Sequence, residues 1–439
     1  MTALAAGVLI VEHTFEALIV LLFAMALPLV IGQPVFGAYF LAALIPFDLV
    51  WSSLAGNWFL KILGLGFLFL WVSKRLVIHR QLRITYSTEL ALFASLSVLA
   101  LASGLWAVHL QQDYFSANVS NFSLLMWFLF TYNAIINRTQ LMTLIKVFVF
   151  SATLSATIAI YSYMMGVGLL AGRAIGGASD PNELAVILVS AIPLALALAS
   201  SAGATWKKLL YSCAVPLLSM AVLTTGSRGG FLLLMCAFPI SMIIVRSWLG
   251  RGLLALSAAA LLYSGWIFAG TLLLGRFQEL SMFGGSFGVQ RFDLWKLAWK
   301  SIQDRFLLGA GLGSFRYLVP QMQSSDATLS ATLYGTQVAH NTYLSVWAEL
   351  GSIGLLLFGS IIALSLYRLY RSVVFENQMK RGQSKWYTLC LAILFGFLLC
   401  LFGASMLNME RSKLMWLFVM CASILWKSYS ENIKISRLG

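Results

Sequence analysis

Residues 183–201 read ELAVILVSAIPLALALASS, a run with no charged residue after Glu183. As an α-helix rising 1.5 Å per residue, such a run crosses about 30 Å of hydrocarbon. Similar runs recur along the chain. Backbone groups inside lipid must be hydrogen-bonded within their own segment or in a closed barrel, so we interpret these runs as transmembrane helices.

The composition agrees with this interpretation. Of 439 residues, 60% are hydrophobic and only 10% are charged, whereas about a quarter are charged in a typical soluble domain. We therefore expect an all-α, polytopic membrane helical bundle with about twelve transmembrane helices. The expected spans are 14–31, 58–73, 88–107, 121–137, 141–165, 183–201, 209–225, 230–246, 252–274, 341–366, 388–407 and 413–427.

The amino-terminal part is harder to assign. Residues 32–57 are apolar but are broken by Pro34, Pro46 and Gly56, which fits either a re-entrant pair or one further short span. No Lys or Arg precedes Lys61, and no cleavage site is obvious. We therefore expect the first apolar run to be a retained span rather than a signal peptide.

The net charge of +14 does not form a nucleic-acid-binding patch, because the basic residues punctuate the gaps between apolar runs. Every second gap is basic, which the positive-inside rule assigns to the cytoplasmic side. We expect a multi-pass protein of the bacterial inner (cytoplasmic) membrane. The basic residues are Lys74, Arg75, Arg80, Arg83, Arg138, Lys207, Lys208, Arg246, Arg251, Arg368, Arg371, Lys380, Arg381, Lys385, Lys427, Lys434 and Arg437; the opposite gaps are 108–120, 166–182, 226–229, 275–340 and 408–412.

One external gap is unusually long. At about 65 residues, 275–340 exceeds ordinary connections, which favours a functional loop. Within it, Phe292, Trp295, Trp299, Ile302 and Phe306 recur at helical spacing, and the other face carries Arg291, Lys296, Lys300 and Asp304. This predicts an amphipathic helix at the membrane surface, whose aromatic side meets lipid headgroups or the bundle. The chain thus divides into a bundle at 1–274, a periplasmic loop at 275–340, and carboxy-terminal spans with a cytoplasmic tail at 341–439.

Charged groups on the external side are the candidates for chemistry. Arg228 lies in TGSRGG at 225–230, where glycines expose backbone N–H groups and an arginine beside them makes a site for phosphate oxygens. The alternative is a tight helical hairpin whose arginine only reaches the interface. Three neighbouring glycines favour the anion site.

Arg173 and Arg291 are two further candidates. Arg173 lies in AGRAIGG at 171–177, just before Asp180. Asp180 is expected to cap the helix that starts at Pro181, which explains it without a catalytic role. Arg173 is a candidate phosphate contact. Arg291 begins the amphipathic helix and can turn toward the same site, although arginines on helix surfaces usually face solvent.

His340 differs from the other histidines, His13, His79 and His109, because it lies where the long loop returns to the membrane. A neutral imidazole can take a proton from a sugar hydroxyl at neutral pH. The alternative is a histidine that only caps the next helix. Its place beside the loop and three external arginines favours a catalytic base.

Signals for metals and cofactors are missing from the sequence. It has no Asp-x-Asp pair at an external helix start and no His/Cys cluster with metal spacing, so we expect neither metal nor other cofactor. The stretch GAGLG at 309–313 resembles a dinucleotide loop, but it follows a helix rather than a strand, and we discard that reading.

Taken in order, these motifs resemble those of the O-antigen ligase and Wzy-type polymerase superfamily. The resemblance covers most of the chain after about residue 165. It rests on Arg173 with Asp180-Pro181-Asn182, Ser227-Arg228-Gly229-Gly230, Arg291 through Trp299, Gly309 through Phe315, His340-Asn341-Thr342-Tyr343-Leu344 and Glu349-Leu350-Gly351. Residues before 165 show no distinctive family motif.

The resemblance implies a metal-independent, inverting glycosyltransferase that works at the periplasmic face. Its donor would be an undecaprenyl-diphosphate-linked glycan, and a ligase would transfer this glycan to lipid A–core oligosaccharide. Arg228 and Arg291 would bind the diphosphate, Arg173 would assist, and His340 would activate the acceptor hydroxyl.

Several alternatives stay open at this point. A Wzy-type polymerase would use a second lipid-linked glycan as acceptor, and a protein O-glycosylation ligase would use a protein. A lipid-linked glycan transporter belongs to another class, which often shows repeated halves that this sequence lacks. The sugar, its linkage and the oligomeric state are not encoded in any motif found.

Overall fold

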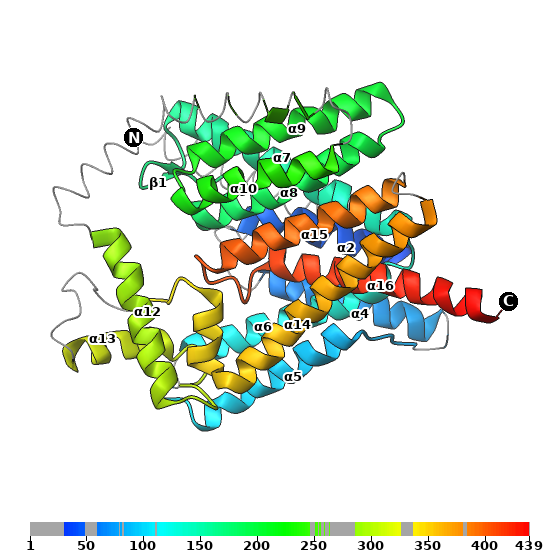
Figure 1. Ribbon diagram of the computed structural model, residues 1–439. Coiled ribbons are helices and arrows are strands. Elements are labelled where there is room, and N and C mark those ends of the chain that lie inside the picture. Colours follow the sequence, from blue (N-terminus) through cyan, green and yellow to red (C-terminus); the bar gives the residue numbers. More distant parts are fainter. Residues whose placement is uncertain are drawn as a thin grey trace, which may run out of the picture.

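The chain forms a bundle of α-helices with one short β-hairpin (Figure 1). This computed structural model describes residues 30–48, 59–78, 80, 83–109, 112–245, 286–325, 337–380 and 384–438, with isolated residues between 251 and 263. The helices are α2 (Val35–Ala43), α4 (Phe59–Val77), α5 (Thr88–Ala102), α6 (Gln112–Ala134), α7 (Arg138–Met165), α8 (Pro181–Ser201), α9 (Thr205–Thr224), α10 (Arg228–Ile244), α12 (Ser286–Asp304), α13 (Phe315–Ser325), α14 (Thr342–Lys380), α15 (Lys385–Ala404) and α16 (Lys413–Leu438). Short 3-10 turns η1 (Ile45–Phe47) and η2 (Ser103–Leu105) and strands β1 (Leu169–Leu170) and β2 (Arg173–Ala174) complete the elements.

Among the described residues, 6 helices are long and apolar enough to cross a membrane: α5 with η2, α7, α8, α9, α14 and α15. The helix α10 is apolar but shorter. Two expected spans, 14–31 and 252–274, fall largely outside the described residues. The all-α bundle is therefore found, while the number of twelve spans stays a prediction.

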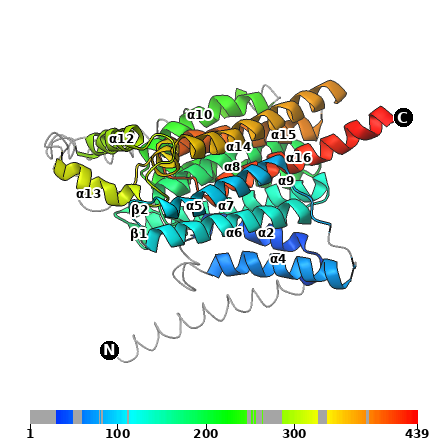
Figure 2. The same cartoon turned by 90° about the horizontal axis from the view of Figure 1, so that it is seen from below.

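The connections between helices fall at two ends of the bundle (Figure 2). Connectors near 78–87, 135–138, 202–204 and 380–384 lie at one end, which we call the basic end. The turns at 166–180, 225–227 and 405–412 lie at the other end together with α12 and α13, and we call this the loop end. The connectors of the basic end thus lie at the opposite end from α12 and α13, while the side of the membrane that each end faces stays a prediction.

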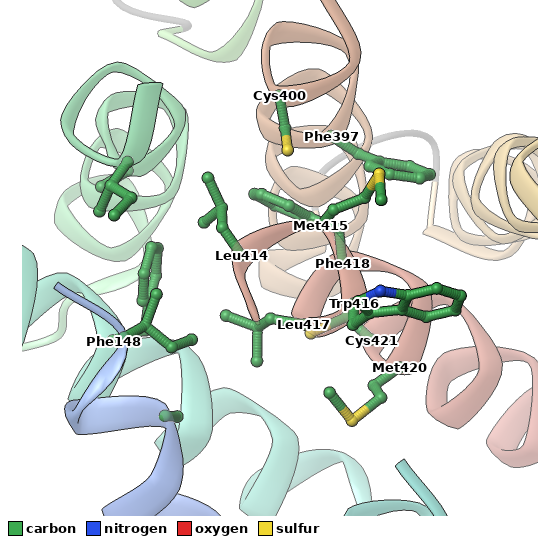
Figure 3. Close-up of a cluster of buried hydrophobic side chains, with 14 of the residues drawn as sticks. Phe148, Phe397, Cys400, Leu414, Met415, Trp416, Leu417, Phe418, Met420 and Cys421 are labelled. Atoms are coloured by element: carbon green, nitrogen blue, oxygen red, sulfur yellow. The ribbon is translucent and has the colours of Figure 1, made fainter. Parts of the chain in front are cut away.

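Helix α8 lies at the centre and is buried along nearly its whole length. Glycines on α15 let the two helices approach closely, since a Cβ at Gly403 would lie 2.7 Å from Val186. Small residues at such contacts are typical of helix packing in membranes. Beside them, Phe418 stacks on Phe397 with ring centroids 5.8 Å apart, within a cluster that also holds Cys400 and Cys421 (Figure 3).

Buried ion pairs tie α14 to its neighbours toward the basic end. Arg368 binds Glu89 of α5, and Arg138 of α7 lies 2.8 Å from Glu376. Tyr429 of α16 donates a hydrogen bond to the same Glu376. Loss of one partner from such a pair leaves an uncompensated buried charge, so these contacts fix the register of α14.

The segment at 30–48 crosses the bundle once. Lys74, at the basic end, donates hydrogen bonds to the carbonyls of Ile31 and Gly32. At the loop end, a Cβ on Gly177 would lie 2.6 Å from Phe47. Residues 49–57 lie outside the described residues, so the choice between a re-entrant pair and one short span stays a prediction.

The turn GAGLG at 309–313 packs its backbone against a break in α14. The break is at Gly351, whose φ of 67° and ψ of −170° are not helical. Ala310 and Gly311 donate backbone hydrogen bonds to the carbonyls of Ala348 (2.8 Å) and Glu349 (2.9 Å). The glycines thus serve a close backbone approach rather than a nucleotide.

We predict that Gly351→Ala destabilises the protein. A Cβ at this position would collide with the carbonyl oxygen of Leu307, and its φ is strained for alanine. The expected loss is about 2 kcal/mol, measured as a lower melting temperature in detergent. Gly359→Ala is the matched control on the same helix, because no atom lies within 4 Å of its Cβ position. Equal melting of Gly351→Ala and unmodified protein would contradict the packing account.

Candidate functional site

Arg228 is the first residue of α10 at the loop end. The Ser227 side chain caps this helix by accepting from the Gly230 backbone N–H at 3.0 Å. Gly230 is required by packing, since a Cβ there would collide with Ala185 of α8. The exposed Arg228 side chain therefore stands at a helix amino terminus, where the backbone dipole favours anions.

Arg173 braces the turn that leads to Arg228. Its Nε donates to the carbonyl oxygen of Thr225 at 2.7 Å, and its Nη2 donates to Asn182 Oδ1 at 2.7 Å. The side chain also lies over Gly226, whose Cβ position is 3.6 Å from Arg173 Cγ. Arg173 thus joins the hairpin, the α9–α10 turn and the start of α8.

Asp180 caps α8, as the sequence predicts, by accepting from the backbone N–H groups of Asn182 and Glu183. Its carboxylate has a second effect. It acts electrostatically on both Arg291 and His340. An acidic group assigned only to capping therefore also belongs to the charged surroundings of the site.

Arg291 reaches the same region from α12. Burial lowers its pKa first, the positive charge of Arg228 lowers it further, and Asp180 opposes both effects. Arg228 and Arg291 are therefore close enough for their charges to interact. Two like charges held together in this way make a site that an anion would stabilise.

His340 stands just before α14 in a left-handed backbone conformation with a φ of 48°. Its neighbour Asn341 caps the helix, since Asn341 Oδ1 accepts from the backbone N–H groups of Tyr343 (3.0 Å) and Leu344 (3.1 Å). Asn341 therefore caps the helix, and capping does not explain why a histidine stands at position 340. Positive φ in a residue other than glycine is uncommon and is concentrated at functional sites.

The surroundings of His340 keep its imidazole neutral. Burial lowers its pKa below the ordinary value, and the nearby charge of Arg291 lowers it further, against the opposing effect of Asp180. The segment is held from the other side by α12, because Trp295 Nε1 donates to the Ala339 carbonyl at 3.0 Å. A half-buried neutral imidazole at a fixed position can accept a proton near pH 7.

A polar cavity of about 190 Å³ opens next to this segment. It lies between the starts of α6 and α13, the first turns of α14 and the α15–α16 connection. Its polar lining is Asp113, Ser116, Ser120, Arg316, Ser345, Glu349, Asn408 and Arg411, and Val338 completes the wall nearest His340.

Residues 213–359 match the family model described as O-antigen ligase. The matched segment makes up 147 of the 439 residues and is similar to the O-antigen ligase family. The resemblance to the O-antigen ligase and Wzy-type polymerase superfamily is thus confirmed. With its apolar helices, the chain is a membrane protein. A comparison with curated proteins gives no match.

The O-antigen ligase segment contains Arg228, Arg291 and His340, whereas Arg173 lies before it. The structure brings Arg228, Arg291 and His340 within electrostatic reach of one another or of shared Asp180. Arg173 lies on the adjoining turn. A single cavity shared by Arg228 and His340 stays a prediction, as do the chemical roles of all four residues.

The sequence patterns did not predict the residues that line the polar cavity. They indicated three external arginines, yet Arg316 and Arg411 also lie at the loop end. Charged residues in the short gap 408–412 were the available signal. Asp113, Glu349 and Asn408 come from three separate segments, so no local motif joins them.

The helix α12 lies where the sequence predicts it, but the predicted aromatic face is divided between exposed and buried side chains. Trp299 and, after the helix, Phe306 are exposed, and their rings also pack on Trp347 of α14 with centroids 5.6 and 5.9 Å apart. Ile302, which was placed on that face, is instead buried with Leu294 and Leu297 against α14. The face that packs is aliphatic because it must fit between Phe315, Val319 and Ala348.

Among the described residues, no group of three His, Cys, Asp or Glu side chains could hold a metal ion. The described part therefore offers no protein-built metal site. Metal independence stays a prediction.

We predict that Arg291 sets the acidic limit of activity. If neutral His340 is the base, as the sequence predicts, the rate of the reaction should fall as pH drops through its pKa. Arg291→Gln removes a positive charge that lowers this pKa, so the acidic limb of the pH–rate profile should move to higher pH. Arg291→Lys keeps the charge and should leave the limb in place. Identical limbs in both variants would contradict the assignment.

Proposed function

We propose that the protein transfers a glycan from an undecaprenyl-diphosphate donor to lipid A–core oligosaccharide at the periplasmic face of the inner membrane. The reaction is inverting and needs no metal ion. His340 is the general base, and Arg228 and Arg291 bind the diphosphate, with Arg173 holding the turn that carries Arg228.

The observation that carries this proposal is the pairing of a neutral histidine with clustered arginines at one end of a membrane bundle. Burial and Arg291 keep the pKa of His340 low, while Arg291 and Arg228 interact as like charges. A departing diphosphate would relieve that repulsion. Cations placed where negative charge develops are the usual source of stabilisation in such reactions.

The proposed step balances without a co-reactant. The oxygen of an acceptor hydroxyl bonds to the anomeric carbon of the donor sugar as the bond from that carbon to the phosphate oxygen breaks. The bonding electron pair leaves with undecaprenyl diphosphate, and His340 takes the hydroxyl proton. Attack from the face opposite the leaving group inverts the anomeric centre.

The structure also supports a donor that arrives from lipid. The arginine site lies at the end of apolar helices, so a polyprenyl tail can stay in the hydrocarbon while its diphosphate reaches the loop end. Exposed Trp299 and Phe306 on α12 and the loop that follows it suit the headgroup layer.

The test is reconstitution with a purified undecaprenyl-diphosphate glycan and lipid A–core. His340→Asn is the sharpest variant, because asparagine tolerates positive φ but cannot act as a base at neutral pH. We expect its transfer rate to fall by about 10²- to 10⁴-fold, with chelator having no effect on the unmodified protein. His79→Ala, in the predicted cytoplasmic connector, should retain full activity.

Other outcomes distinguish the alternatives. Extension of the donor into longer lipid-linked chains would identify a Wzy-type polymerase, and transfer to a protein would identify a protein O-glycosylation ligase. Movement of unchanged donor across the bilayer, without release of undecaprenyl diphosphate, would identify a transporter. Full activity of His340→Asn would remove the general base from the account.

A further inference from the structure

The polar cavity has the features of a built binding site rather than a gap between loops. An ion pair fixes one wall, where Arg316 lies 2.9 Å from Asp113 and Tyr317 donates to the same carboxylate at 2.9 Å. Burial alone would raise the pKa of Asp113, but these hydrogen bonds outweigh burial and hold it below the ordinary value. Asp113 is therefore an ionised acceptor at neutral pH.

The opposite wall is also held in place. Asn408 Nδ2 donates to Ser345 Oγ at 2.9 Å, and Thr342 Oγ1 donates to the Leu407 carbonyl at 2.7 Å. These contacts fasten the α15–α16 connection to the first turns of α14. Glu349, buried at 8% exposure, completes this wall.

Several buried polar atoms around the cavity have no protein partner. They include Asn408 Oδ1, Arg316 Nε and Arg411 Nη1. A buried polar atom without a partner is unfavourable by about 1–3 kcal/mol, so a polar ligand that reached these atoms would stabilise this part of the structure. The set contains both donors and acceptors, which matches hydroxyl groups that donate and accept at once.

The balance of charge points to the class of ligand. Each arginine of the lining already has a carboxylate partner, since Arg316 lies 2.9 Å from Asp113 and Arg411 lies 3.4 Å from Glu410, so neither guanidinium is left as an unpaired cation. A diphosphate would prefer the arginines around Arg228. Serine, amide, carboxylate and guanidinium groups in one cavity suit the many hydroxyls of a sugar.

The position of the cavity relative to His340 fits the proposed reaction. His340 lies on a segment whose two ends, Val338 and Ser345, line the cavity. Arg291 and Asp180 act on His340 itself. An inverting displacement needs the acceptor hydroxyl opposite the departing diphosphate, and the base must stand beside that hydroxyl.

We propose that the cavity bounded by Asp113, Arg316, Glu349, Asn408 and Arg411 binds the acceptor saccharide and presents its hydroxyl to His340. This inference rests on the proposed transferase function and names the substrate that the cavity holds. The saccharide is recognised through its hydroxyl groups. It can belong to a core oligosaccharide or to a second lipid-linked repeat unit.

The experiment uses two cavity variants of the full-length protein. Asn408→Leu removes the unpartnered amide oxygen, and Ser120→Phe fills the space from the α6 side. Asn118→Leu is the matched control on α6, because Asn118 does not line the cavity. We expect both cavity variants to raise the KM for acceptor about tenfold, with the KM for donor unchanged, and Asn118→Leu to change neither.

A binding measurement separates this inference from the proposed function. The inactive His340→Asn protein should bind free core oligosaccharide or free repeat-unit oligosaccharide in saturation-transfer NMR. Adding Asn408→Leu or Ser120→Phe should abolish the signal in protein that keeps its melting temperature. The saccharide that binds identifies the acceptor source.

Two results would overturn the inference. One is saccharide binding that is unchanged by both cavity substitutions, and the other is no saccharide binding at all. If the saccharide binds in the cavity but no glycan transfer occurs, the proposed function fails while the cavity assignment stands. If transfer occurs with an unchanged KM for acceptor in both variants, the cavity assignment fails while the proposed function stands.

Discussion

The burial of α8 at the centre of the bundle is the constraint on which the site depends. Close contacts with α15 and α10, made possible by Gly403 and Gly230, fix its axis and its rotation. Its first turn then presents Asp180 and Asn182 at the loop end. Asn182 accepts a hydrogen bond from Arg173, and Arg173 donates another to the turn before Arg228. The positions of these two arginines therefore depend on α8.

A second rigid element positions the base. The break in α14 at Gly351 is locked against the turn at 309–313 by backbone hydrogen bonds. The first turns of α14 are thereby held between α12 and the α15–α16 connection, with His340 at their start. Arg291 on α12 is thus within electrostatic reach of His340 before α14, and burial lowers the pKa of both residues.

Much of this arrangement follows from the sequence. Apolar runs and alternating basic gaps predict the helices and their directions, because the free energy of transfer from water to lipid depends on the residues of each segment alone. Asp180 before Pro181 predicts a helix start through local capping chemistry. Arg228 stands out because the positive-inside rule disfavours arginine on the external side, and His340 because it lies where the long loop returns to the membrane.

Other features depend on contacts between distant segments. Arg368 counts as a topology signal in the sequence, yet it is paired with buried Glu89. Helical spacing groups Ile302 with aromatic residues, but packing against α14 takes Ile302 to the inner face. The polar cavity joins residues from α6, α13, α14 and the α15–α16 connection, and only the fold brings them together.

The most direct test of the account is a structure of the protein with undecaprenyl diphosphate bound in a lipid nanodisc. The account predicts the diphosphate between Arg228 and Arg291 at the loop end, with His340 beside the position of the departing sugar. A diphosphate bound at the basic end, or one that leaves both arginines without contact, would contradict the central claim.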